Sequence, residues 1–164
     1  MGRSLLTLLV ALATLAGCAD KVTILNVVPR LTWVAVAPPV DGVVEITVWV
    51  SDTDGDPVDV DARWAEDPKG AGVRGDSLRM APGGHGLVGL TTEGGLFDPN
   101  GEAHVVRWDV SDVNPQGPIR LHFVPDDLDA GVGQAVRTPP FTLSEGIPAP
   151  VPVEDDPTAE LPRA

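Results

Sequence analysis

The chain has 164 residues, with 11 basic and 24 acidic side chains and a formal net charge of -13 at pH 7. This charge excludes nucleic acid as a partner, because phosphates are bound by clustered lysine and arginine. It also argues against peripheral binding to anionic lipid, and the length suits one domain of ordinary size.

Residues 1–18 have the layout of a secretory signal peptide, with a positive tip at Arg3 and the apolar run Leu5–Leu15. The run is about 11 residues long, too short for a spanning helix of roughly 20. It leads into Leu15-Ala16-Gly17-Cys18, which resembles the lipobox of bacterial lipoproteins. The resemblance implies removal of residues 1–17 and attachment of palmitate-like acyl chains to Cys18, which would anchor the protein stably. The alternative is a plain signal peptide that ends at an ordinary cysteine.

The residues around the predicted cleavage point suggest where the mature protein resides. Cys18 is the only cysteine, so the exported part is expected to have no disulfide. In lipoproteins, an aspartate directly after the cysteine favours the inner membrane; here Ala19 follows and Asp20 is one place later, which favours the outer membrane by resemblance. Residues 18–29 are expected to be a lipidated tether. Loss of Arg3 with the leader would leave a net charge near -14.

Residues 30–143 are dominated by alternation of apolar and polar side chains, and no window has sustained helical periodicity. The runs 44–50, 58–64 and 119–123 each present one apolar face, which is typical of antiparallel strands. Glycine and proline clusters separate the runs. Further strands are predicted at 31–37, 86–92, 103–110 and 135–143, with 65–85 as a glycine-rich loop carrying a short strand at 78–80. We therefore expect an all-β fold, a single antiparallel β-sandwich of about seven strands.

The C-terminal residues 144–164 have a different composition, rich in proline and acid. Such a segment buries little apolar surface and favours an extended, polyproline-like conformation. We expect it to be a disordered tail that follows the domain.

Four stretches of the folded part resemble, in order, fibronectin-type-III-like or immunoglobulin-like modules of bacterial exported proteins. They are Ile46–Trp64, His104–Asp109, Ile119–Asp126 and Pro140–Leu143. The resemblance covers about residues 30–143 and departs from the family pattern in 65–85. It implies an Ig-like structural and binding scaffold without catalytic residues.

The same resemblance gives two expectations about packing. Trp64 would be the buried tryptophan of the third strand. The third and sixth strands would be neighbours, so Asp59 or Asp61 would approach Arg120 on the solvent face.

Two acidic loops would lie at the same end of such a sandwich, at 52–56 and 126–129. Their carboxylates belong to Asp52, Asp54, Asp56, Asp126, Asp127 and Asp129. Facing carboxylates repel one another unless a cation separates them, and calcium binds six to eight oxygens. Pro57 rules out an EF-hand loop. The alternative is a pair of solvated turns, since aspartate and glycine are common turn residues.

The remaining candidate residues point away from catalysis. Trp33 and Trp49 have the parity of the solvent face, which suits stacking on carbohydrate or contact with a protein; the alternative is that neighbouring segments cover them. The histidines lack metal-ligand spacing, and the serines lack a Gly-x-Ser-x-Gly context. We expect no enzyme and no cofactor apart from possible calcium.

Taken together, the sequence predicts a non-catalytic, lipid-anchored cell-envelope protein that presents an Ig-like β-sandwich for adhesion, scaffolding or assembly. The alternative is a calcium-dependent or carbohydrate-binding module that uses the acidic loops 52–56 and 126–129. The expected partners are the membrane, through the N-terminal lipid, and a protein or glycan.

Overall fold

The computed structural model describes residues 27–67, 75–92, 98, 100–128 and 131–157. This part of the chain contains strands and no helix. The strands are β1 (Arg30–Val36), β2 (Val43–Ser51), β3 (Asp59–Glu66), β4 (Asp76–Ser77), β5 (Glu102–Asp109), β6 (Ile119–Asp126), β7 (Val136–Arg137), β8 (Ile147–Pro152) and β9 (Glu154–Asp155).

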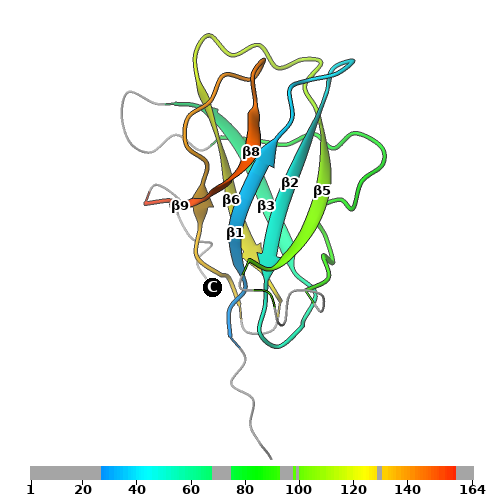
Figure 1. Cartoon of the computed structure of the whole chain (residues 1–164), viewed down its shortest axis with the longest axis vertical. Coiled ribbons are helices and arrows are strands. Elements are labelled where there is room, and N and C mark those ends of the chain that lie inside the picture. The colour runs from blue at the N-terminus through cyan, green and yellow to red at the C-terminus, as the bar shows by residue number, and fades with distance from the viewer. Residues whose placement is uncertain (1–26, 68–74, 93–97, 99, 129–130, 158–164) are drawn as a thin grey trace, which may run out of the picture.

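The strands form two antiparallel sheets that pack against each other (Figure 1). Sheet A has the order β5-β2-β1-β8, and sheet B has the order β4-β3-β6-β7-β9. The predicted all-β sandwich is confirmed. The second strand lies beside the fifth and the third beside the sixth, as strands B and E and strands C and F do in Ig-type sandwiches.

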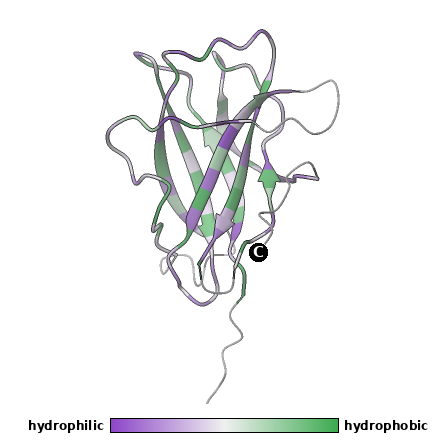
Figure 2. Cartoon of the chain, turned by 180° about the vertical axis from the view of Figure 1, so that it is seen from behind, coloured by the Kyte–Doolittle hydropathy of each residue, from purple (hydrophilic) through white to green (hydrophobic). Residues whose placement is uncertain are grey.

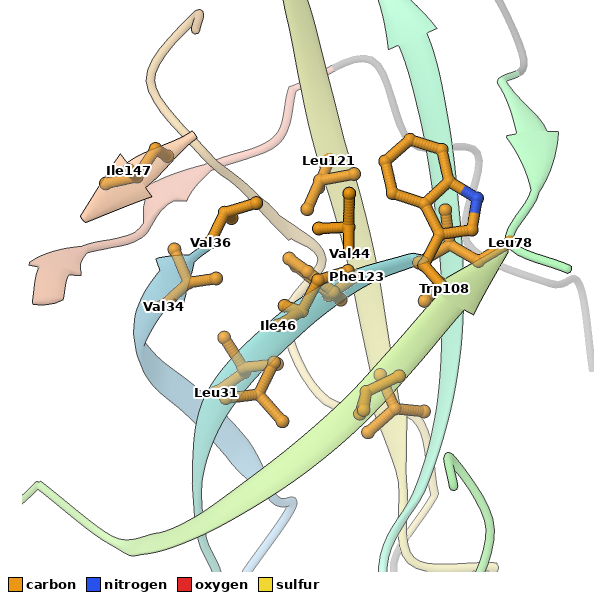
Figure 3. Close-up of a cluster of buried hydrophobic side chains, with 14 of the residues drawn as sticks. Leu31, Val34, Val36, Val44, Ile46, Leu78, Trp108, Leu121, Phe123 and Ile147 are labelled. Atoms are coloured by element: carbon orange, nitrogen blue, oxygen red, sulfur yellow. The ribbon is translucent and has the colours of Figure 1, made fainter. Parts of the chain in front are cut away.

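The core lies between the sheets and consists of the apolar face of each strand (Figure 3). Along β2, Val44, Ile46, Val48 and Val50 are fully buried, while the residues between them are not. Burial of each such aliphatic side chain stabilises the fold by about 1.5–3 kcal/mol. Figure 2 shows the resulting alternation of hydrophilic and hydrophobic residues along the strands.

The fully buried tryptophan of this core is Trp108 on β5, at 1 % exposure. Trp64 has the predicted inward parity on β3 but is only half-buried; its ring packs against that of Trp108 at 6.1 Å between centroids. Its β3 position pairs with Asp76 of the two-residue edge strand β4. The short edge strand gives Trp64 less cover than Trp108 has between β2 and the 79–81 segment. Trp64 therefore packs against the core with the predicted parity but is only partly buried.

Three predicted strand positions differ from the structure. Residues 86–92 form only a bridge between Leu90 and Val58, because Gly86 and Gly89 have positive φ angles of 77° and 65° that interrupt a strand. In 135–143 only Val136–Arg137 is a strand, and the Pro139-Pro140 pair ends it since proline lacks an N–H donor. The short strand expected at 78–80 lies instead at Asp76–Ser77.

The C-terminal segment is built into the sandwich as far as residue 157, so the prediction of a disordered tail over 144–164 was wrong there. Strand β8 extends sheet A by pairing with β1, and β9 extends sheet B by pairing with β7. Asp156 is buried, and its main-chain N–H donates to the carbonyl of Ala135. The remainder, residues 158–164, lies outside the described residues.

The prolines of β8 are compatible with a strand because of where they fall. Val153 donates its N–H to the carbonyl of Thr32 on β1. Pro152 is next to this donor, at an alternate position whose N–H would point away from β1. Pro148 and Pro150 lie where the β1–β8 register shifts, between the Val34–Val151 and Val36–Ile147 pairs, and proline is tolerated at such irregularities. The outer edge of sheet A therefore offers few donors to another strand, which protects it from edge-to-edge pairing.

Arg120 holds this C-terminal segment from the outer face of sheet B. The expected approach of Asp59 or Asp61 was wrong, because the β3–β6 register places Arg120 opposite Ala65. Its guanidinium instead meets Asp67 at 2.7 Å and Glu154 of β9 at 3.4 Å, and donates to the carbonyl of Thr138.

Removal of residues 144–164 is therefore expected to destabilise the domain. Ile147 would lose its place in the core, and the edges of β1 and β7 would become exposed. The expected loss is about 3 kcal/mol or more of unfolding free energy, measured by urea denaturation. Truncation after 157 is the control and should leave stability unchanged. Equal stability of all three chains would contradict this account of the C-terminal segment.

Candidate functional site

The outer face of sheet A carries two tryptophans side by side. Trp33 of β1 and Trp49 of β2 are cross-strand partners, and both are half-buried. Directly opposed residues on one sheet face have Cβ atoms about 4.5–5.5 Å apart, so the two tryptophans are immediate neighbours on this face. Pro152 and Ala103 continue the same row across β8 and β5. We refer to this surface as the tryptophan face.

A β-bulge orients Trp33 toward this face. The register of β1 against β2 shifts between Leu31 and Trp33, which makes Thr32 the extra residue. Its hydroxyl lies 2.5 Å from the carbonyl oxygen of Asn100 and 3.3 Å from that of Trp49. A bulge changes the parity of a strand, so Leu31 and Val34 both point into the core while Trp33 points outward.

On one side the neighbours of the tryptophan pair are small and uncharged, whereas on the other side the next row pairs Arg30 with Ser51. The uncharged row consists of Ala35, Thr47 and Val105. An ion pair between Arg107 and Glu45, at 3.6 Å, lies beyond this row. In a chain with a net charge of -13, this centre of uncharged side chains is a distinctive surface.

The outer face of sheet B is charged. Arg63 pairs with Asp61, Arg120 with Asp67 and Glu154, and Arg137 lies near Glu154. His122, between Arg63 and Arg137 in the ladder, shares a 2.6 Å hydrogen bond with Asp156. These partners belong to the fold itself, since they connect β3, β6, β7 and the C-terminal segment.

The two predicted acidic loops lie at one end of the sandwich, where β2 and β6 both end (Figure 1). We call this end the acidic pole. Val27, where the described chain begins, also lies here, because its N–H donates to Asp54 at 2.7 Å. Asp52 and Asp127 are buried at 3 % and 5 % exposure.

Asp52 is the central carboxylate of the acidic pole. Its Oδ1 accepts a hydrogen bond from the Asp54 N–H at 2.8 Å, whereas its buried Oδ2 has no hydrogen-bond partner within the described residues. Burial raises the pKa of Asp52 above its ordinary value of 3.8. The hydrogen bond from Asp54 partly offsets this, and the charges of Asp127, Asp54 and Asp56 raise the pKa of Asp52 further.

The other two predicted acidic residues are placed differently. Asp126 has the outward parity of β6 and lies opposite Asp59, and its Oδ1 caps the turn by accepting the Leu128 N–H. Asp129 lies outside the described residues, as does Cys18. The carboxylate that approaches Asp52 from the second loop is therefore that of Asp127, whose Oδ1 accepts the Gly131 N–H.

No arrangement for nucleophilic catalysis emerges in the described part of the chain. His104 is buried and its Nε2 lies 2.8 Å from the Thr91 carbonyl; His85 lies on the surface with its Nδ1 accepting the Val105 N–H. An open groove of about 470 Å³ near Phe141 and Pro148 has Asp67 and Glu145 as its only ionisable lining residues.

The described residues contain neither a metal-binding group of three or more side chains nor a membrane-spanning helix. Among the described residues, no three histidine, cysteine, aspartate or glutamate side chains form a group arranged to hold a metal ion. The same part of the chain contains no helix with the length and hydrophobicity required to cross a bilayer.

No protein-family model matches the chain, and neither does any curated protein or any solved structure. The candidate sites therefore rest on the sequence and the geometry alone.

The raised pKa of Asp52 predicts a specific pH dependence of stability. A raised pKa means that the protonated form of Asp52 is favoured in the folded state. Its contribution to the free energy of unfolding is therefore fully present below pH 3.8 and is lost as the pH rises through the raised pKa of Asp52 in the folded protein. Asp52→Asn keeps the acceptor for the Asp54 N–H and removes the charge. In chelator at pH 7 we expect the variant to be more stable by about 1 kcal/mol, or roughly 3 °C in Tm.

At pH 3 the advantage of Asp52→Asn should vanish. Thermal melts of both chains across this pH range provide the measurement. A variant that is less stable than the parent at pH 7 would show that the Asp52 charge has a stabilising partner.

Proposed function

We propose that this chain is a non-catalytic, lipid-anchored protein of the bacterial cell envelope that binds a protein partner through the tryptophan face, as an adhesion, scaffold or assembly module. The observation that carries the proposal is the cross-strand pair of Trp33 and Trp49 beside the uncharged row of Ala35, Thr47 and Val105. Partly exposed tryptophans at the centre of an apolar patch are the residues that most often dominate protein–protein affinity.

The surroundings of the pair favour a protein over a glycan. Carbohydrate sites combine stacking with precisely placed polar groups that fix the ligand. Ala35, Ala103, Val105 and Pro152 offer no side-chain hydrogen bonds around the indoles. The polar side chains of the two adjacent rows are those of Thr47, Ser51 and Arg30. A protein partner can instead cover these side chains with apolar groups and exclude water.

The N-terminal sequence supports the anchored part of the proposal. The lipobox-like stretch Leu15–Cys18 implies acylation of Cys18, and the resemblance at Ala19 and Asp20 favours the outer membrane. Eight residues lie between Cys18 and Val27, so nine residue steps limit the distance between them to about 30 Å. Anchoring would then hold the acidic pole toward the membrane and leave the tryptophan face open at the side.

Cys18→Ser tests the anchor. We expect the variant to be released into the soluble fraction or to remain an unprocessed precursor, because the thiol is the acceptor for lipid. Fractionation with mass spectrometry of the N-terminal peptide measures both outcomes. Normal processing with unchanged membrane association would reject lipid anchoring at this residue.

Trp33→Thr combined with Trp49→Thr tests the binding surface. Threonine suits an exposed strand position, so the domain should fold while the aromatic surface is lost. Hot-spot residues contribute about 2 kcal/mol or more, and the expected loss of affinity is at least about 30-fold. Co-purification from the native envelope, followed by titration of the captured protein, provides the measurement.

The matched control is Asp61→Thr combined with Arg63→Thr, which removes an exposed ion pair from the outer face of sheet B. It should bind as the parent does. Equal binding by both double variants would contradict the proposal. If envelope polysaccharide binds the parent and only the tryptophan variant loses it, the partner is a glycan.

A further inference from the structure

The acidic pole contains a buried pair of like charges that the binding proposal does not use. Asp52 and Asp127 come from different loops and are both more than nine-tenths buried. One oxygen of each carboxylate accepts a hydrogen bond within its own loop. Asp52 accepts from the N–H of Asp54, and Asp127 accepts from the N–H of Gly131. The charge of Asp127 raises the pKa of Asp52, so the two carboxylates repel each other.

The second oxygen of Asp52 points to a missing ligand. This Oδ2 is buried and has no hydrogen-bond partner among the residues that the structure describes. A buried polar atom without a partner costs about 1–3 kcal/mol, and buried oxygen atoms of this kind are expected to have a proton donor, water or ion nearby. Asp54 and Asp56 add further negative charge to Asp52 and its surroundings.

We propose that Asp52 and Asp127 together bind one calcium ion, which connects the 52–56 loop to the loop after β6. Two carboxylates supply part of the coordination, and main-chain carbonyls and water can supply the rest of the six to eight oxygens. A site with two acidic ligands agrees with the lack of a three-residue acidic group among the described residues. Asp126 is not part of it, because it has the outward parity of sheet B.

Calcium fits this position better than magnesium. Magnesium requires near-octahedral geometry and keeps several waters, whereas calcium accepts irregular sets of protein oxygens. Sites in extracellular modules bind calcium with dissociation constants of about 0.1–1 mM. This range sets the concentrations for the test.

The test compares Tm values of the full mature chain in chelator and in 5 mM calcium chloride. For the parent we expect calcium to raise Tm by about 3–6 °C, and magnesium to raise it less. Asp52→Asn is expected to fold, with less than 1 °C of calcium response. Asp61→Asn, which removes an exposed carboxylate from sheet B, is the control for general charge screening and should respond as the parent does.

Calorimetric titration with calcium chloride provides the second measurement. We expect the parent to bind one ion, and Asp52→Asn and Asp127→Asn to give no heat of binding. Two outcomes would overturn the proposal. One is an identical Tm of the parent in calcium and in chelator; the other is an equal calcium response of the parent and Asp52→Asn, which would place the ion elsewhere. Neither outcome bears on the tryptophan face.

Discussion

The structure depends on burial of one apolar face from each sheet against the other. Valine and isoleucine side chains of β1 and β2 meet Leu121 and Phe123 of β6 across the core, with Trp108 beside Leu78 at one side of it (Figure 3). Because side chains alternate along a strand, this burial places every second residue on an outer face. Two outer faces and two ends of the sandwich therefore remain for binding or other function. The C-terminal segment connects the two sheets, because it adds one strand to each.

The two outer faces have different chemistry, which follows from their cross-strand partners. On sheet B, arginines alternate with carboxylates and satisfy one another. On sheet A, the bulge at Thr32 brings Trp33 beside Trp49 in a row of small, uncharged side chains. Charged groups are costly to strip of water at an interface, whereas indoles gain from it. The tryptophan face is therefore the surface best suited to a partner, and the charged face keeps the other side of the domain solvated.

Much of the fold could be predicted from the sequence, because β2, β3 and β6 have uninterrupted alternation and their neighbours follow from a common sandwich topology. The position of both acidic loops at one end followed from that topology too. The proline-rich β8 could not be predicted, since its composition suits a polyproline tail and only pairing with β1 distinguishes the two. Equally, nothing local reveals the bulge at Thr32, which lets Leu31 and Val34 both face the core. The burial of Asp52 and Asp127 could not be predicted either, because it depends on how two distant loops meet.

The central claim is that this protein acts through the outer face of sheet A. It is tested most directly by a photo-crosslinking amino acid placed at Thr47, beside the tryptophan pair, in the intact envelope. A matched probe at Asp61 reports on the outer face of sheet B, where Asp61 is exposed. The account predicts a discrete crosslinked partner from Thr47 and none from Asp61. A partner captured from Asp61, with Thr47 remaining unreacted, would contradict it.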